Sequence, residues 1–242
     1  MRLYLDGGNT RIKWQLRDGG QVTVEGGGNL AGTDLFADAA DYSGQIESVA
    51  VSTVRSETDQ RYIEQALQRL TDAPVTFYWT RAQYRDLVCG YQDFDRMGAD
   101  RWHAMVAVRG LTREPVVVID AGSAITVDWI AASGQHEGGY IVPGRRLMLE
   151  SLRQNTARVL FEPDFTVDGL RPGQSTQECV SHGVNWALQA LARQLALDPS
   201  IHGRRVYLTG GDGLSLTPAF CGRGIFIPDL VFDGLERVAC GL

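Results

Sequence analysis

Hydrophobic positions follow two different periods along the chain, which predicts a mixture of strands and helices. Short runs in which apolar residues are continuous or alternate predict β-strands at residues 2–6, 11–17, 21–25, 47–52, 75–79, 116–120, 125–130, 137–142, 204–208 and 224–227. Apolar residues spaced by three and four predict amphipathic helices at residues 57–71, 99–109, 145–154, 177–197 and 229–239. Since these elements alternate without a low-complexity linker, the pattern indicates an α/β fold.

The strand and turn at the start of the chain recur in its second half. Leu3–Thr10 reads as an apolar strand that ends in Asp6, then a small residue, a glycine and polar residues, and Val117–Ala124 repeats this order around Asp120. Each copy leads into a second β-like run. A motif repeated at a half-chain period predicts two similar lobes, with a cleft between them. We place these lobes at residues 1–114 and 115–242.

Charge and composition exclude several classes of protein. The formal net charge of −6 gives the chain no bulk cationic field for a nucleic-acid backbone or an anionic membrane. No apolar run approaches the ~18 residues that cross a bilayer, and the N-terminus does not read as a secretory signal. The cysteines form no CxxC pair and the histidines show no metal-ligand spacing. We therefore expect a soluble cytoplasmic protein without nucleic-acid or membrane partners.

The two Asp-x-Gly turns predict a phosphate-binding clamp. A glycine turn between strands leaves backbone N–H groups exposed to an anion, and the aspartate can hold a cation or the water shell of Mg²⁺ against it. Asn9, Thr10, Ser123 and Thr126 would add side-chain hydrogen bonds. A third glycine-rich stretch, Leu208–Gly213, would approach adenine and ribose. The alternative is a pair of ordinary hairpins in which each aspartate stabilises its own turn.

Lysine usage singles out one position. Lys13 is the one lysine among 23 basic residues, and the others are arginine. A compact ammonium and a planar guanidinium differ most at close quarters, so Lys13 is predicted to contact phosphate as a point charge. The alternative is that this lysine survived by chance. A P-loop and a complete GxGxxG fingerprint are both absent from the sequence, which excludes Walker-type nucleotide binding and disfavours a dinucleotide fold.

Asp100 is the candidate proton acceptor. It lies in the first turn of a predicted helix, where the helix dipole and Arg101 favour its ionised form. An ionised carboxylate can accept the proton of a substrate hydroxyl during phosphoryl transfer, and the Arg101 fork suits a substrate carboxylate. The alternative for this pair is helix capping with a surface ion pair.

Together these residues resemble the type III pantothenate kinases of the actin/Hsp70/sugar-kinase superfamily. The resemblance runs in order from residue 3 to about residue 213, and no single piece of it is specific alone. The matching segments are Asp6–Thr10 with Lys13, Tyr91, Gly98–Arg101, Asp120–Ala124, Gly138–Gly144, Thr176 and Thr209–Gly211. The family implies two lobes of ribonuclease H-like, actin-like fold, and ATP-dependent phosphorylation of pantothenate to 4'-phosphopantothenate as the first step of coenzyme A synthesis.

The resemblance also implies roles for individual residues. Asp100 would accept the proton, and Asp120 would hold a monovalent cation, K⁺ or NH₄⁺, while Mg²⁺ accompanies ATP. The residues implied to bind ATP are Asp6, Gly7, Gly8, Asn9, Thr10, Arg11, Ile12, Lys13 and Ser123. Those implied to bind pantothenate are Tyr91, Gly98, Ala99, Asp100, Arg101 and Thr176. Such enzymes are homodimers.

The sequence departs from the family pattern at two places. Ser123 stands where threonine is commoner, and Gln174-Ser175-Thr176 replaces a more usual Arg-Asn-Thr. Two other functions stay open at this point. A non-catalytic regulatory protein of the same fold would be expected to lack parts of the clamp or the base. Another small-molecule kinase of the superfamily, for a sugar or acetate, would not require Tyr91 with the Gly98–Arg101 motif.

Overall fold

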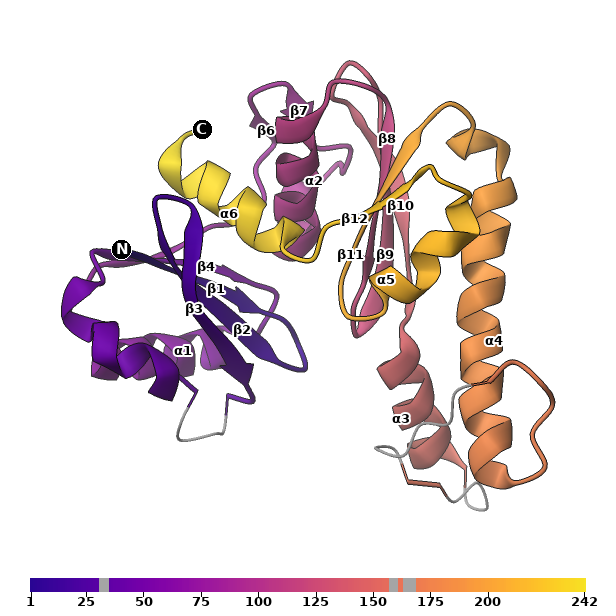
Figure 1. The fold of residues 1–242 in the computed structure, drawn as a ribbon. Coiled ribbons are helices and arrows are strands. Elements are labelled where there is room, and N and C mark those ends of the chain that lie inside the picture. The colour runs from indigo at the N-terminus through magenta and orange to yellow at the C-terminus, as the bar shows by residue number, and fades with distance from the viewer. Residues whose placement is uncertain (31–34, 157–160, 163–168) are drawn as a thin grey trace. The chain divides into compact units, whose positions relative to one another are not determined.

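The computed structural model describes residues 1–30, 35–156, 161–162 and 169–242. The chain forms two compact units, each with its own sheet (Figure 1). The first unit comprises Met1–Arg113, Gly134–His136 and Asp229–Leu242, and the second comprises Glu114–Ser133 and Glu137–Pro228.

A five-stranded sheet forms the centre of the first unit, in the order β3-β2-β1-β4-β5. Its strands are β1 (Arg2–Gly7), β2 (Ile12–Asp18), β3 (Gln21–Gly28), β4 (Ser48–Thr53) and β5 (Val75–Phe77). The first three strands are antiparallel neighbours, whereas β4 pairs parallel with both β1 and β5. The carboxyl ends of β1 and β4 therefore meet at one edge of the sheet.

Helices cover both faces of this sheet. On one face, Leu3, Leu5, Val49 and Val51 share a core with residues of α1 (Glu57–Leu70). On the other face, Tyr4 and Ala50 pack with residues of α6 (Leu230–Cys240), which lies against α2 (Ala99–Leu111). Successive strand residues point to opposite faces, so Asp6 shares the α2 and α6 face with Tyr4.

The second unit repeats this topology. Its sheet has the order β10-β9-β8-β11-β12, with β8 antiparallel to β9 and parallel to β11, which in turn pairs parallel with β12. The strands are β8 (Val116–Ala121), β9 (Ala124–Ile130), β10 (His136–Pro143), β11 (Arg205–Thr209) and β12 (Gly224–Phe226). Its helices are α3 (Arg145–Asn155), α4 (Thr176–Leu197) and α5 (Gly213–Leu216). Asp6 and Asp120 thus end the corresponding central strands β1 and β8.

The predicted elements are confirmed, with bounds that differ by only a few residues. Two elements escape the sequence pattern, because they are too short to show a period: α5 and the small hairpin of β6 (Gln83–Tyr84) and β7 (Leu87–Val88). Short 3-10 helices are the other addition, at Ala37–Gln45, Phe94–Arg96, Pro199–Ile201 and Thr217–Phe220. Within the described part of the chain, every helix is too short or too polar to span a membrane.

The first unit ends at Arg113, one residue before the predicted division at 114/115, and it also includes two later segments, Gly134–His136 and Asp229–Leu242. The second segment contains α6, and Figure 1 shows this yellow helix beside elements of the first unit. The buried Arg17 of β2 explains its place, since it donates to Asp233 Oδ1 at 2.9 Å and to Glu236 Oε2 at 2.6 Å. Gly234 allows close packing, because a Cβ there would collide with the His103 carbonyl.

Candidate active site

The first Asp-x-Gly turn joins β1 to β2 and is held from β4. Thr53 Oγ1 donates to the Gly7 carbonyl at 3.0 Å, and Arg55 donates to the carbonyls of Gly8 and Asn9 at 2.8 and 2.9 Å. Gly7 is required here, because a Cβ would lie 2.6 Å from Thr53 Oγ1. The carbonyl oxygens of this turn are therefore bound by its own unit, which fixes the turn's conformation.

Lys13 and Ser52 lie on either side of Asp6. Lys13 of β2 and Ser52 of β4 are both in register with Asp6 of β1. Residues in register on neighbouring strands point to the same face of the sheet, so these three side chains share one face. Lys13 is exposed, Asp6 is half-buried and Ser52 is buried. The geometry supplies an accessible ammonium beside a strand-end carboxylate, the pair predicted from the sequence.

The predicted substrate residues Tyr91, Asp100 and Arg101 come together at the start of α2. Arg101 is 4% exposed and donates from Nη1 to the Tyr91 hydroxyl at 2.7 Å, with its guanidinium carbon 5.5 Å from the Tyr91 ring centre. Asp100 Oδ1 accepts from the Arg101 backbone N–H at 2.7 Å. Tyr91 in turn stacks on His136, with ring centres 6.1 Å apart. The first turn of α2 therefore carries a carboxylate bound to the backbone and, at the next residue, a guanidinium oriented by Tyr91.

Gly98 is the N-cap of α2, and its lack of a side chain matters. A Cβ at Gly98 would lie 2.5 Å from Asp100 Oδ1 and 3.4 Å from Val54 Cγ1. Val54 itself donates its backbone N–H to the Gly7 carbonyl at 3.3 Å. The start of α2 and the first Asp-x-Gly turn therefore both contact the end of β4.

His103 is a buried residue that the sequence interpretation did not single out. It lies on α2, and its Nδ1 is 2.8 Å from the Ser52 hydroxyl. Burial, with a smaller contribution from the positive charge of Arg81, lowers the pKa of His103 to about 3. The imidazole is therefore neutral in the folded protein at physiological pH.

This burial predicts a pH dependence of folding. As the pH falls through 6.5, the unfolded chain protonates His103 while the folded chain does not until about pH 3, so stability is lost on acidification. Between pH 7 and pH 5 this group should remove roughly 2 kcal/mol from the free energy of unfolding. Urea unfolding at both pH values should show a correspondingly weaker pH dependence for His103→Asn. Equal losses in the two proteins would contradict the assignment.

The second Asp-x-Gly turn joins β8 to β9 and gathers the other glycine-rich segments of its unit. Asp212 donates its N–H to the Ala121 carbonyl at 3.0 Å, and Gly144 donates to the Ser123 carbonyl at 3.0 Å. Gly210 has a φ of +83°, and a Cβ there would collide with the Asp120 carboxylate. The stretch Leu208–Gly213 thus lies against the Asp120 turn.

The surroundings of Asp120 supply oxygen atoms of the kind that bind cations. The carboxylate and the Ala121 carbonyl both border the space that a Cβ at Gly210 would fill, and Thr126 and Thr209 are in register with Asp120. Carboxylate and carbonyl oxygens are the donors that such ions take. Among the described residues, no group of three or more His, Cys, Asp or Glu side chains could hold a metal ion by itself.

Arg145, which the sequence analysis did not predict, forms hydrogen bonds next to the Asp120 turn. At the start of α3, its Nε lies 3.1 Å from Asp212 Oδ1 and its Nη1 donates to Asn185 Oδ1 of α4. The remaining predicted residue, Thr176, begins α4 after the N-cap Ser175. Thr176 borders an apolar groove of about 1060 Å³ between α3 and α4, also lined by Leu147 and Val184.

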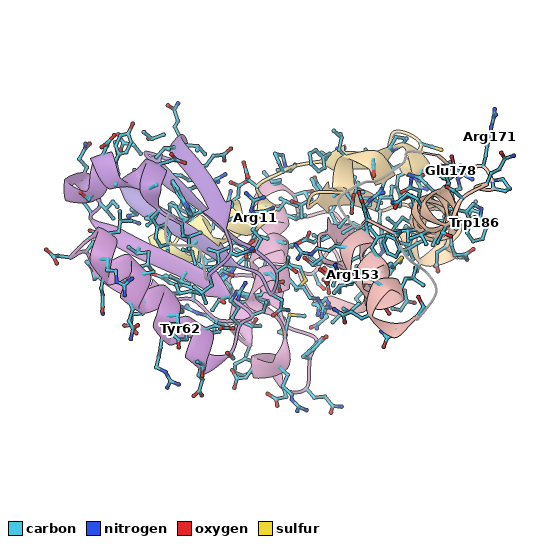
Figure 2. All side chains as sticks on the ribbon, turned by 90° about the horizontal axis from the view of Figure 1, so that it is seen from below. Arg11, Tyr62, Arg153, Arg171, Glu178 and Trp186 are labelled. Atoms are coloured by element: carbon cyan, nitrogen blue, oxygen red, sulfur yellow. The ribbon has the colours of Figure 1, made fainter. Side chains whose placement is uncertain are left out.

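The predicted ATP-binding residues differ in how accessible their side chains are to a ligand. The Ile12 side chain is fully buried in the core of its unit, so a contact with ligand would have to come from its main chain. Ala99, which is predicted to bind pantothenate, is also buried. Arg11 (Figure 2) donates from Nη2 to the Gly27 carbonyl at 3.1 Å. Gly8, Asn9, Thr10 and Ser123 lie in the two turns and are at least partly exposed.

Two of the solved structures that resemble this chain illustrate the fold. A candidate Baf family transcriptional activator from Campylobacter jejuni has a TM-score of 0.59 at 21% identity, covering 99% of this chain and 98% of its own. A candidate 2-dehydro-3-deoxygalactonokinase from Sinorhizobium meliloti has a TM-score of 0.56 at 12% identity, with full coverage of both chains. At such identities the likeness concerns the fold, and it confirms the predicted α/β class with two sheet-containing lobes.

Sequence comparison identifies the family. The model of the type III pantothenate kinases matches residues 2–197. The type III pantothenate kinase of Marinobacter nauticus is 40% identical over 240 residues, covering 99% of this chain and 98% of that protein. That of Pseudomonas paraeruginosa is 38% identical over 249 residues, covering 99% of both. With the family model matching most of its length and relatives aligned nearly end to end, the chain belongs to the type III pantothenate kinase family.

Proposed function

We propose that the residues at the start of α2 carry the chemistry of the family's reaction, with Asp100 as the proton acceptor. The chain is a kinase that transfers phosphate from ATP to pantothenate in coenzyme A biosynthesis. The 4'-hydroxyl oxygen of pantothenate attacks the γ-phosphorus, the bond to the β–γ bridging oxygen breaks, and ADP leaves. The hydroxyl proton passes to the Asp100 carboxylate.

Pantothenate would be held through its carboxylate and its polar chain. The Arg101 guanidinium, oriented by the Tyr91 hydroxyl at 2.7 Å, suits the carboxylate. Gly98 and Ala99 would contribute backbone at the beginning of α2, where the helix dipole favours an anion. Thr176, at the start of α4, is assigned on the family resemblance, and its hydroxyl would add one hydrogen bond.

ATP would be held by the two Asp-x-Gly turns. From the first unit, residues Asp6–Lys13 would meet the phosphates, and from the second unit Ser123 would add its hydroxyl. The family uses ATP with a divalent metal, and bound Mg²⁺ neutralises charge on the β- and γ-phosphates. Asp120 would hold K⁺ or NH₄⁺, which the mixture of carboxylate and carbonyl oxygens around Gly210 supports.

The single observation that carries this assignment is the convergence of Tyr91, Asp100 and Arg101 at one helix end, next to the β4 segment that holds the first turn. The experiment is to incubate the protein with ATP, Mg²⁺, K⁺ and pantothenate, and to detect product by mass spectrometry alongside ADP release. We expect 4'-phosphopantothenate and an equal amount of ADP. Pantothenate lacking the 4'-hydroxyl serves as the control and should give neither. Phosphorylation of a sugar or acetate in preference to pantothenate would overturn the assignment.

Lys13→Arg is expected to impair the enzyme although it conserves charge. The ammonium is compact and the guanidinium is broad and planar, so the replacement cannot approach phosphate beside Asp6 in the same way. We expect a higher KM for ATP and a lower kcat, with an unchanged melting temperature because Lys13 is exposed. Arg11→Lys, two residues away in the same hairpin, gives the reverse exchange for comparison. A fully active Lys13→Arg enzyme would show that the lysine has no special role.

An assembly and a location are also part of the proposal. We propose a homodimer, as the family resemblance implies, in which the apolar groove between α3 and α4 would be a surface for the second copy. Trp186 of α4 (Figure 2) is a separate exposed apolar side chain, 63% exposed and outside the lining of this groove. The cytoplasm supplies ATP and is the proposed location.

The regulatory alternative is not favoured. The full-length relatives are kinases by name, and Asp6, Lys13, Asp100 and Asp120 are all present in this chain. The likeness to a candidate transcriptional activator rests on 21% identity and concerns the fold alone.

A further inference from the structure

Two buried side chains outside the predicted site join β4 to α2. Ser52 and His103 are both 0% exposed, and Ser52 Oγ lies 2.8 Å from His103 Nδ1. Among the described residues, His103 Nε2 has no hydrogen-bond partner. The Ser52 hydroxyl is thus the polar contact that orients the ring.

Ser52 lies next to the first Asp-x-Gly turn. It is in register with Asp6, and the two side chains point to the same face of the sheet. Thr53 and Val54, which follow it, both donate to the Gly7 carbonyl. A group fixed to Ser52 is consequently fixed relative to the Asp6 turn.

His103 lies one helical turn after Asp100. Residues three apart lie on neighbouring positions of one helix face, so the position of His103 sets the height and rotation of the turn that carries Asp100. The backbone of His103 is also confined from α6, because a Cβ on Gly234 would collide with its carbonyl. α2 is therefore held from two sides at His103. α6 packs against the His103 backbone, and Ser52 of β4 contacts the His103 imidazole.

We propose that the hydrogen bond between Ser52 and His103 positions the first turn of α2, and with it the Asp100 carboxylate, relative to the Asp6 turn. His103 and Ser52 act here as positioning residues through Asp100, so the inference rests on the proposed role of Asp100. A displacement of about 1 Å at a reacting group can lower the rate on the order of 10²-fold. A contact that fixes the position of Asp100 can therefore have a large effect on turnover.

The test removes the hydroxyl with little change in volume. Ser52→Ala should lower kcat about tenfold, with the KM for ATP within twofold of wild type. His103→Leu should behave like Ser52→Ala, and the double variant should be no worse than either, because both remove the same contact. His103→Asn, whose amide can replace Nδ1, should restore most of the turnover that His103→Leu loses.

Tyr4→Phe is the matched control. Its buried hydroxyl lies two residues before Asp6 on the same face of the sheet and contacts Glu236. Removing this hydroxyl should leave kcat unchanged.

The Asp100→Asn background separates this inference from the proposed function. There, Ser52→Ala should lower the residual turnover no further, since no carboxylate remains to be positioned. A kcat of Ser52→Ala within twofold of wild type would overturn the inference and leave the role of Asp100 intact, provided that Asp100→Asn alone is impaired. A further tenfold loss in the Asp100→Asn background would also overturn it, since the effect would not pass through Asp100. Near-normal turnover of Asp100→Asn itself would instead refute the proposed role of Asp100 as the proton acceptor.

Discussion

Asp100→Asn is expected to lower kcat by ~10²–10⁴-fold, the range typical of a lost general base. The amide keeps the size of the side chain and retains the oxygen that accepts the Arg101 N–H at 2.7 Å. It cannot accept the proton of the pantothenate hydroxyl as the bond to phosphorus forms. Because the substitution removes an interaction with the transition state and leaves ATP contacts in place, the KM for ATP should change by less than about threefold.

Steady-state turnover with pantothenate and a titration of ATP binding measure the two effects separately. Glu57→Gln provides the control, since Glu57 is an exposed carboxylate in the first turn of α1 in the same unit. Its kcat should equal that of the wild type. Turnover of Asp100→Asn within a few-fold of wild type would remove Asp100 from its proposed role.

The second large effect concerns the monovalent cation. With Na⁺ as the sole monovalent cation, the wild-type enzyme should have little activity, and K⁺ or NH₄⁺ should restore it. The proposed cation at Asp120 would offset the negative charge of the triphosphate, so its removal should act mainly on ATP. K⁺ and NH₄⁺ are large ions that suit a site of one carboxylate with backbone carbonyls, whereas Mg²⁺ requires six oxygen ligands at short distances in an octahedral arrangement.

Asp120→Asn links this effect to one residue. The amide removes the negative charge and should weaken activation by K⁺ far more than it weakens pantothenate binding. ADP release measured across a K⁺ titration at constant ionic strength, for both proteins, gives the comparison. Equal wild-type rates in sodium and potassium buffers would show that Asp120 is only a turn residue.

The strands and long helices were predictable because their patterns are local. The repeat around Asp6 and Asp120 likewise indicated two similar lobes, and both residues end corresponding central strands. The place of α6 was not predictable, since it depends on the buried Arg17 pairing with Asp233 and Glu236 at the far end of the chain. The hydrophobic periodicity of β2 and α6 does not indicate that these residues pair.

For the candidate site, the sequence indicated which residues to consider, but it did not indicate the contacts that hold them in place. Tyr91 and Arg101 carry a recognisable motif, and the structure joins them at 2.7 Å. Arg55 belongs to no motif. It lies just after β4, and the carboxyl end of β4 adjoins that of β1, so its position could have indicated a contact with the Asp6 turn. His103 sits within an otherwise apolar stretch of α2, and its partner Ser52 is known only once the sheet register is known.

The most direct test of the account is the structure of the protein with a non-hydrolysable ATP analogue, Mg²⁺, K⁺ and pantothenate bound. The account predicts that the 4'-hydroxyl lies within hydrogen-bond distance of the Asp100 carboxylate and faces the γ-phosphorus. It also predicts the pantothenate carboxylate on Arg101 and the phosphates on the Asp6 turn. A hydroxyl bound away from Asp100, with another group in contact with it, would contradict the central claim.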